Sequence, residues 1–325
     1  MSAEEAPALN GILLVNKPRG LASKRISTVL SKILPKGRIG HLGTLDPLAD
    51  GLLPILLGKA TRLQDYLITL KKAYRCQVKL GYETDTLDLE GQIQQTKPIA
   101  PFTASELVER VHLLLGASSQ LPPIYSAVKF QGKALYKYAR NGQGDQISFE
   151  RLARPIFIYE AKSLGCNEDS FSFEVVCSKG TYIRVLAQRL ALELANLGTV
   201  TTLTRTQCAG FGLERSVSLE DIQHTGFLQS DAFKKAFVPI EELEIGLPKV
   251  QVVNDRLCKN LMMGQSIQSQ LGVEGDLRGL ENIKDDSISP ERILIFDANR
   301  KALALGTISP ADNGHFAISI TRSLR

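Results

Sequence analysis

The sequence predicts an α+β protein: a mixed, largely antiparallel β-sheet flanked by helices, followed by a small β-rich C-terminal domain. Three observations favour this fold class. Apolar residues make up 43% of the 325 residues, which is enough for a sizeable core. Segments with the two-residue period of strands are interspersed with segments of helical period. These segments lack the regular βαβ rhythm of a doubly wound fold.

The N-terminal part is expected to begin with a flexible lead over residues 1–8 and a short buried strand, GILLVN, over residues 11–16. The turn KPRG ends this strand, and a helix is expected over residues 26–33. Residues 73–83, AYRCQVKLGYE, then alternate between two faces, and Tyr74 lies on the apolar one. This alternation predicts a half-buried strand.

The middle of the chain is expected to contain two helices and two strands. Thr103 and Glu106 form a capping box, which predicts a helix that ends at Gly116. Residues 157–177 contain two expected strands around a polar turn, and the second strand has apolar side chains at period two. Apolar residues at intervals of three to four then predict a helix over residues 183–194.

A domain boundary is expected near residue 245, where acidic residues cluster in IEELEIGLPKV. The larger domain would span residues 9–245 and the smaller, β-rich domain residues 246–325. Within the smaller domain, RILIFDANRKALALGTI predicts a hairpin whose turn lies at residues 298–300.

Basic residues gather in one region, although the net charge is only +5. Residues 6–75 contain twelve Lys and Arg against three acidic residues, whereas residues 240–325 contain ten against twelve. A polyanion is a natural partner for such a region, because each neutralised phosphate releases counterions. The charge pattern alone is equally compatible with a solvated positive face that binds no ligand.

The composition excludes several classes of protein. The five cysteines are odd in number and far apart, without a CxxC pair or a histidine at ligand spacing, so we expect reduced thiols and no metal site. No apolar run reaches the roughly 20 residues that span a bilayer, and the N-terminus lacks the pattern of a signal peptide. The pair Gly58-Lys59 is followed by Ala60, not by the Ser or Thr of a nucleotide-binding loop. We therefore expect a cytoplasmic protein with no membrane contact, metal or organic cofactor.

The segment RIGHLGTLDPLADGLLPILLGKATR, over residues 38–62, places Asp46 in apolar surroundings. Taken alone, Asp46 has a structural interpretation. An Asp-Pro pair commonly caps a helix, and Pro47 suits the first helical position of PLADGLLPILLG. Other residues are needed to decide between a cap and a reactive carboxylate.

Five segments occur in an order that resembles the TruB-type tRNA pseudouridine-55 synthases. The resemblance covers roughly residues 11–220. The segments are GILLVNKPRG, RIGHLGTLDPLADGLLPILLGKATR, KKAYRCQVKLGYETDTLDLEG, PPIYSAVKFQGKALYKYAR and CSKGTYIRVLAQRLALEL. The resemblance implies the pseudouridine synthase fold, with the C-terminal domain resembling a PUA domain.

The resemblance also implies an activity: the enzyme breaks the N-glycosidic bond of a uridine in the tRNA T-arm, turns the base, and rejoins it through C5. Asp46 matches the nucleophile of the family, and Arg184 matches the arginine that pairs with this carboxylate. Tyr74 matches the tyrosine that stacks on the target base and is a candidate for handling the C5 proton. A uridine in a folded loop must first be flipped out, at a cost of a few kcal/mol.

Further positions match residues that bind the substrate in this family. They are Lys17 of the first motif, His41, which lies against the nucleotide stack, Tyr182, the pocket leucine Leu203, and Lys129, Lys133 and Lys137 of a segment that grips the T-arm. Several of the matched residues have a structural alternative as well. Tyr74, Tyr182 and Leu203 could be packing residues, and residues 125–140 could form an ordinary solvated helix.

The sequence departs from the family pattern at two places. After KPRG two small hydroxyl residues are usual, whereas the run Leu21, Ala22, Ser23 and Lys24 lacks one of them and gains a lysine. Leu42 stands where a small or polar residue is usual. The expected partner is tRNA, with no required protein partner and a monomeric state. Two other functions stay open at this point. One is a non-catalytic protein that binds or folds tRNA, and the other is a synthase that acts on ribosomal RNA.

Overall fold

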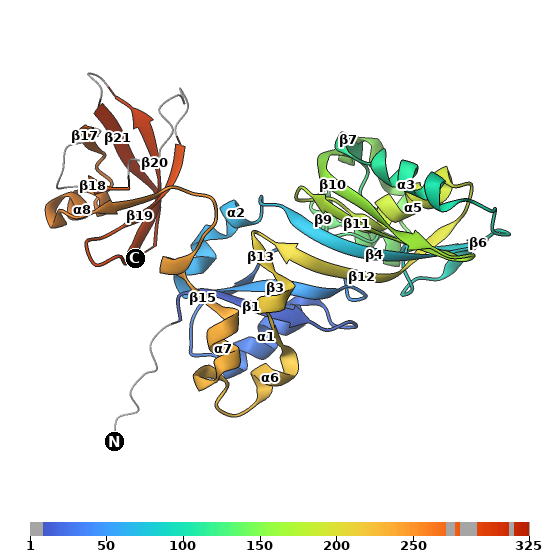
Figure 1. Ribbon diagram of the computed structural model, residues 1–325, viewed down its shortest axis with the longest axis horizontal. Coiled ribbons are helices and arrows are strands. Elements are labelled where there is room, and N and C mark those ends of the chain that lie inside the picture. The colour runs from blue at the N-terminus through green and yellow to red at the C-terminus, as the bar shows by residue number, and fades with distance from the viewer. Residues whose placement is uncertain (1–8, 271–276, 280–290, 312–314, 325) are drawn as a thin grey trace.

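The computed structural model describes residues 9–270, 277–279, 291–311 and 315–324, so the flexible lead expected at residues 1–8 lies outside the described residues. Figure 1 shows one long sheet that runs across most of the molecule and a second, smaller sheet at one end. The large sheet has eleven strands, with the order β14-β1-β3-β12-β4-β11-β10-β7. In addition, β13 pairs with β12, β15 with β1, and β2 with β3.

The strands of the large sheet are β1 (Gly11–Lys17), β2 (Ile39–His41), β3 (Asp50–Leu57), β4 (Lys72–Leu80), β7 (Gly116–Gln120), β10 (Arg154–Cys166), β11 (Ser170–Cys177), β12 (Gly198–Cys208), β13 (Phe211–Gly212), β14 (Val217–Ser218) and β15 (Phe237–Pro239). Two small ribbons pair β5 (Tyr82–Thr84) with β6 (Ile93–Thr96) and β8 (Lys129–Phe130) with β9 (Lys133–Ala134). The helices are α1 (Ser23–Ile33), α2 (Gln64–Leu67), α3 (Ala104–His112), α4 (Leu135–Arg140), α5 (Ile183–Glu193), α6 (Leu219–Gln223), α7 (Asp231–Ala236) and α8 (Asp255–Met262).

The predicted fold class is confirmed. In the large sheet, β1 with β14 and β3 with β12 are parallel, and the other described pairs are antiparallel. The smaller sheet has the order β17-β21-β20-β19-β16-β18. Its strands are β16 (Lys249–Val252), β17 (Ile267–Gln270), β18 (Leu277–Arg278), β19 (Glu291–Phe296), β20 (Ala302–Pro310) and β21 (His315–Ser323). These strands form the expected β-rich C-terminal part, including the hairpin of β19 and β20.

Most predicted elements are confirmed, and the local chemistry explains them. Strands β1, β4, β10 and β11 and helix α5 lie where the periodicity predicts them. The capping box is present, since the Thr103 hydroxyl accepts from the Glu106 backbone N–H and the Glu106 carboxylate accepts from the Thr103 backbone N–H. Helix α3 is shorter than predicted, because it ends at His112 and Gly116 begins β7.

The helix suggested for PLADGLLPILLG is wrong, because residues 50–57 form the buried strand β3. A short continuous apolar run does not distinguish a buried strand from a buried helix, which is why the periodicity misled here. Pro54 has no backbone N–H to donate, yet strand β3 tolerates it. Its carbonyl accepts from the Leu42 N–H at 2.9 Å and so points toward β2, and the nitrogen of a strand residue points to the same side as its carbonyl. The missing donor of Pro54 therefore points to the side where pairing with β2 has ended at His41.

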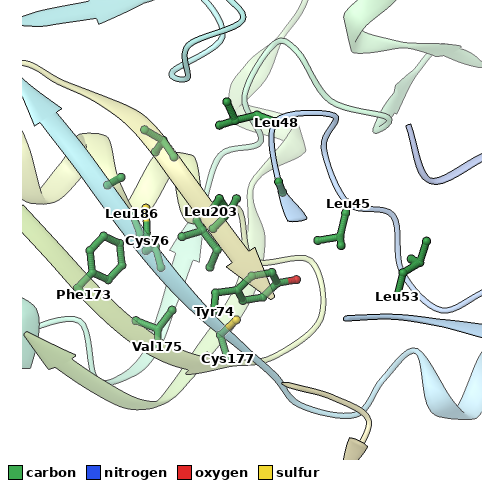
Figure 2. Packing of buried hydrophobic residues seen from close by; sticks show 14 of the residues in the cluster. Leu45, Leu48, Leu53, Tyr74, Cys76, Phe173, Val175, Cys177, Leu186 and Leu203 are labelled. Atoms are coloured by element: carbon green, nitrogen blue, oxygen red, sulfur yellow. The ribbon is translucent and has the colours of Figure 1, made fainter. Parts of the chain in front are cut away.

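One apolar core lies between the sheet and the helices α1, α3, α5, α6 and α7 (Figure 1), and Figure 2 shows part of it. Figure 2 shows Tyr74 and Cys76 of β4, Leu203 of β12 and Leu186 of α5 in this core. The alternation along β4 thus buries the face that carries Tyr74, as predicted. The same core includes leucines from the loop before β3, which brings that loop to the sheet.

A second core joins the two sheets. It combines Ile12 and Leu56 of the large sheet with Leu294 and Phe296 of β19, and it also contains Leu324. Our boundary near residue 245 stays a proposal, because apolar packing runs continuously from one side of it to the other. In the described part of the chain, no helix is both long enough and apolar enough to cross a membrane.

Candidate active site

Asp46 lies in the loop of residues 42–49, between the strands β2 and β3. Its neighbours Leu45 and Leu48 are each 3% exposed and belong to the core, which explains why an acidic residue stands in an apolar stretch. The Ser23 hydroxyl accepts from the Leu45 N–H at 2.8 Å and donates to the Leu45 carbonyl at 3.1 Å. The loop is thereby fixed, and the Asp46 side chain stays 36% exposed at its surface.

Arg184 is the ion-pair partner of Asp46. It lies in the first turn of α5, its side chain is 4% exposed, and its Nε donates to Asp46 Oδ2 at 2.9 Å. The other two nitrogens bind backbone, Nη1 the Thr86 carbonyl and Nη2 the Tyr125 carbonyl at 3.1 Å. All three arms of the guanidinium are therefore occupied, and the expected pairing with Asp46 is present.

A second carboxylate, Asp88, lies near the same nitrogen of Arg184, with Oδ2 3.7 Å from Nε. Its side chain is also 4% exposed, and its Oδ1 accepts from the Thr86 hydroxyl at 2.6 Å and from the Glu90 N–H at 3.0 Å. A buried charge needs such partners, because removal from water disfavours it. Arg184 Nε is therefore shared by a buried carboxylate and a partly exposed one.

Tyr74 and Leu203 come from the neighbouring strands β4 and β12 and lie in one core cluster (Figure 2). Tyr74 is 9% exposed and Leu203 is 5% exposed, so both pack as core residues do. Burial raises the pKa of Tyr74 to about 12, and the nearby Arg205 guanidinium opposes this rise. The Tyr74 ring is therefore neutral at physiological pH.

Comparison of the sequence with known proteins identifies the family of this chain. Residues 31–183 match the family model of the N-terminal domain of TruB family pseudouridylate synthases. A tRNA pseudouridine synthase B of Lactobacillus johnsonii is 40% identical over 268 residues, covering 80% of this chain and 87% of that protein. One of Nitrosococcus oceani is 35% identical over 297 residues, covering 88% and 95%. The chain belongs to the TruB family of pseudouridylate synthases.

Solved structures agree with this TruB-family fold. The chain superimposes on one titled "Crystal Structure of a Cbf5-Nop10-Gar1 Complex" with a TM-score of 0.70 and 23% identity, over 97% of this chain and 85% of the other. A second, titled "Structure of H/ACA RNP bound to a substrate RNA containing 2'-deoxyuridine", gives a TM-score of 0.68 and 22% identity, over 100% and 92%. At these identities the likeness concerns the fold.

His41 of this TruB-family enzyme ends β2, five residues before Asp46, and is half-buried. Its Nδ1 lies 3.5 Å from the Ser27 hydroxyl and its Nε2 lies 3.4 Å from the Thr44 hydroxyl. Burial lowers the pKa of His41, and the positive charge of Arg205 lowers it further. The ring is therefore mostly neutral near pH 7, which suits contact with nucleotide bases.

Tyr182 lies at the N-terminal boundary of α5, two residues before Arg184. Its backbone N–H donates to Gln120 Oε1 at 2.8 Å, and its carbonyl accepts from Gln120 Nε2 at 3.1 Å. Burial raises the pKa of its hydroxyl. The paired hydrogen bonds to the buried Gln120 fix where α5 begins and therefore where Arg184 points.

Lys17 is fully buried at the end of β1, although the sequence suggests that it binds substrate. Its Nζ donates to the carbonyls of Leu21 at 2.6 Å, Pro18 at 3.0 Å and Pro47 at 3.4 Å. Pro47 directly follows Asp46. A direct contact of Lys17 with RNA does not fit this burial, so we assign it the role of holding the Asp46 loop.

The burial of Lys17 predicts a pH-dependent contribution to stability. Burial lowers its pKa from 10.5 to about 8, so between these values the unfolded chain holds a proton that the folded chain has released. The free energy of unfolding therefore gains a positive slope with pH in this window. Lys17→Met is expected to remove this slope in denaturant titrations, and Lys162→Met, on the surface of β10, serves as the control. Equal slopes in wild type and Lys17→Met would contradict the assignment.

Residues 125–140, which we call the basic segment, contain the hairpin of β8 and β9 followed by the short helix α4, not a single solvated helix. Lys129 and Lys137 are exposed. Lys133 is half-buried, since its Nζ donates to Gln143 Oε1 at 2.8 Å and lies 4.4 Å from the centre of the Tyr138 ring. Two of the three expected RNA-binding lysines are therefore free to meet phosphates without rearrangement.

The departures from the family pattern leave the site intact. Leu42 is fully buried in the second core, so its larger side chain points away from Asp46. Ser23 is 1% exposed and makes both hydrogen bonds to Leu45 described above, which assigns the retained hydroxyl a purely internal role. The replacement of its neighbour by Ala22 removes none of these contacts.

Sequence reasoning missed two buried residues of the site, Asp88 and Arg205. Asp88 lies in the quoted family segment that contains YETDTLDLEG, and Arg205 lies two residues after Leu203. Asp88 is 3% exposed and Arg205 is 1% exposed, and charged residues are buried to this degree almost only when they are paired with specific partners. In the described part of the chain, no group of three or more acidic, His or Cys side chains could hold a metal ion.

Proposed function

We propose that the protein converts uridine 55 in the T-arm of tRNA to pseudouridine, with Asp46 as the nucleophile. The observation that carries the proposal is the partly exposed Asp46 carboxylate, paired with the buried Arg184, in a member of the TruB family. The relatives named tRNA pseudouridine synthase B support tRNA as the substrate. We further propose that the enzyme acts in the cytoplasm as a monomer without a protein partner.

The reaction requires a flipped uridine, whose extrusion costs a few kcal/mol. Stacking of the base on an aromatic ring supplies about 1 to 3 kcal/mol, and we assign this contact to Tyr74. Leu203 would form the wall beside it, while the flat, neutral His41 would fill the gap left in the loop. Tyr182 would line the pocket at the start of α5.

The isomerisation breaks the N1–C1′ bond, turns the base, and forms the C5–C1′ bond. The proton on C5 leaves, and N1 gains one. Asp46 can promote this by attack on the base or on the sugar C1′, and both routes need an ionised carboxylate. Arg184 Nε contacts only Oδ2 of Asp46, which leaves Oδ1 as the attacking oxygen.

The runner-up is a non-catalytic protein that binds or folds tRNA through the same surface. It needs basic and aromatic groups but no buried ion cluster. Burial of Arg184 and Asp88 away from water costs free energy, and tRNA binding alone gives no reason for this cost. An enzyme that must hold Asp46 in a fixed geometry does give one, so the cluster favours the enzyme.

The decisive experiment is site-resolved pseudouridine mapping on an unmodified tRNA transcript incubated with the pure protein. One new pseudouridine at position 55 is the expected result. An rRNA fragment in the same assay tests a synthase of ribosomal RNA. Binding without any conversion would overturn the proposal in favour of the runner-up.

The basic segment predicts the salt dependence of tRNA binding. Replacing Lys129, Lys133 and Lys137 with Ala is expected to flatten the plot of log affinity against log salt by about 2 units. Each phosphate contact contributes roughly one unit, and two of these lysines are exposed. Filter binding over a range of salt concentrations measures this slope. Three exposed lysines elsewhere, Lys162, Lys234 and Lys235, give the control. An unchanged slope would remove the segment from the RNA contact.

A further inference from the structure

The large sheet consists of two parts that meet at one short parallel contact. Strands β1, β3 and β14 lie on one side, and β12, β4, β11, β10 and β7 on the other. In the described chain, β12 pairs with β3 only through Thr204 and Arg205. Asp46 precedes β3, whereas Tyr74 and Leu203 belong to the other part. The relative placement of these three side chains therefore depends on this junction.

Arg205 crosses the junction with its side chain. It is 1% exposed, and its Nε donates to the Leu52 carbonyl at 2.7 Å. Its Nη2 donates to the carbonyls of Gly43 at 3.1 Å and Leu42 at 3.4 Å. These carbonyls lie on both sides of Asp46 in the chain. The described ion pairs do not include Arg205, and its charge is met by these backbone oxygens and by the Tyr74 hydroxyl.

The same guanidinium lies close to the two rings assigned to base contacts. Arg205 is directly opposite Tyr74 in the register of β12 and β4. Its positive charge lowers the pKa of the Tyr74 hydroxyl, whereas the nearby thiols of Cys177 and Cys208 raise it. It also acts on His41. One buried cation therefore binds the loop of the carboxylate, lies opposite Tyr74 in the sheet and acts on His41 through its charge.

We propose that Arg205 is a positioning residue for pseudouridine formation, which holds the Asp46 loop against the strands that carry Tyr74 and Leu203. This inference rests on the proposed function. A planar guanidinium can bind three carbonyls at fixed angles, whereas the ammonium of lysine is a point charge without this fork. A displacement of about 1 Å of a reacting group costs about 100-fold in rate.

The test is Arg205→Lys, with Arg189→Lys as the matched control. Arg189 lies on α5 with its side chain 47% exposed and ion-paired with Glu193. In single-turnover assays on tRNA, Arg205→Lys is expected to lose about 100-fold in rate with tRNA affinity within about threefold. The control is expected to match wild type. A folded Arg205→Lys protein with the parental rate would overturn the proposal.

Amide hydrogen exchange supplies a readout that does not depend on activity. In Arg205→Lys, amides of residues 42–49 are expected to exchange faster, while those of β11 stay protected. Uniformly faster exchange would indicate general destabilisation and would overturn the positioning role, as would no change. Arg205→Gln gives the same test if the lysine variant does not fold. If wild type forms no pseudouridine, the proposed function fails, whereas the exchange pattern still decides whether Arg205 holds the loop.

Discussion

Asp46→Asn is expected to abolish pseudouridine formation while leaving tRNA affinity within about tenfold, equal to about 1.4 kcal/mol. The amide has the shape of the carboxylate but no negative charge with which to attack the base or the sugar. The Asp46 side chain is 36% exposed, so its replacement disturbs little packing. Measurement of pseudouridine at position 55 together with filter binding separates the two effects.

Asp169→Asn is the matched control for this prediction. Asp169 is a similarly exposed aspartate, 46% exposed and ion-paired with Lys79, but it lies in the turn between β10 and β11. Conversion of uridine by Asp46→Asn and Asp46→Ala at the parental rate would show that another group is the nucleophile.

Arg184→Met is expected to remove both activity and a large part of the stability. The variant leaves Asp88 buried with no cation beside it and leaves two backbone carbonyls without their donors. Breaking a buried pair in this way costs about 3 to 5 kcal/mol. Chemical denaturation measures this loss. The conservative Arg184→Lys should also fail in catalysis, because lysine lacks the planar fork.

The double variant Arg184→Met with Asp88→Asn tests the cause of this loss. If the unpaired Asp88 charge is responsible, removing it should restore part of the stability but none of the activity. Arg189, in the same helix, is 47% exposed and paired with Glu193, so Arg189→Met is the control. Equal stability of Arg184→Met and wild type would contradict the role of the buried pair.

Local sequence patterns predicted much of the fold. The alternation around Tyr74 and the capping box at Thr103 depend on neighbours in the chain, and both are confirmed. Strand β3 was misassigned, because its apolar run is buried on both faces and carries no period. Its character follows from pairing with β1 and β12, which no local pattern contains.

The site shows the same limit. The resemblance placed Asp46 and Arg184 together, although they lie 138 residues apart in the chain. The burial of Lys17 was not predictable, because a lysine beside a Pro-Arg-Gly turn resembles a surface residue until three carbonyls surround it. Arg205 escaped notice for a similar reason, since its partners lie more than 150 positions away.

The second core has a consequence for how the protein unfolds. Leu324 is fully buried and belongs to the same apolar cluster as Leu294 and Ile12, although more than 300 residues separate Leu324 from Ile12. Because this cluster contains side chains of both sheets, separating the sheets would expose apolar surface on each of them. The two sheets should therefore melt in a single cooperative transition.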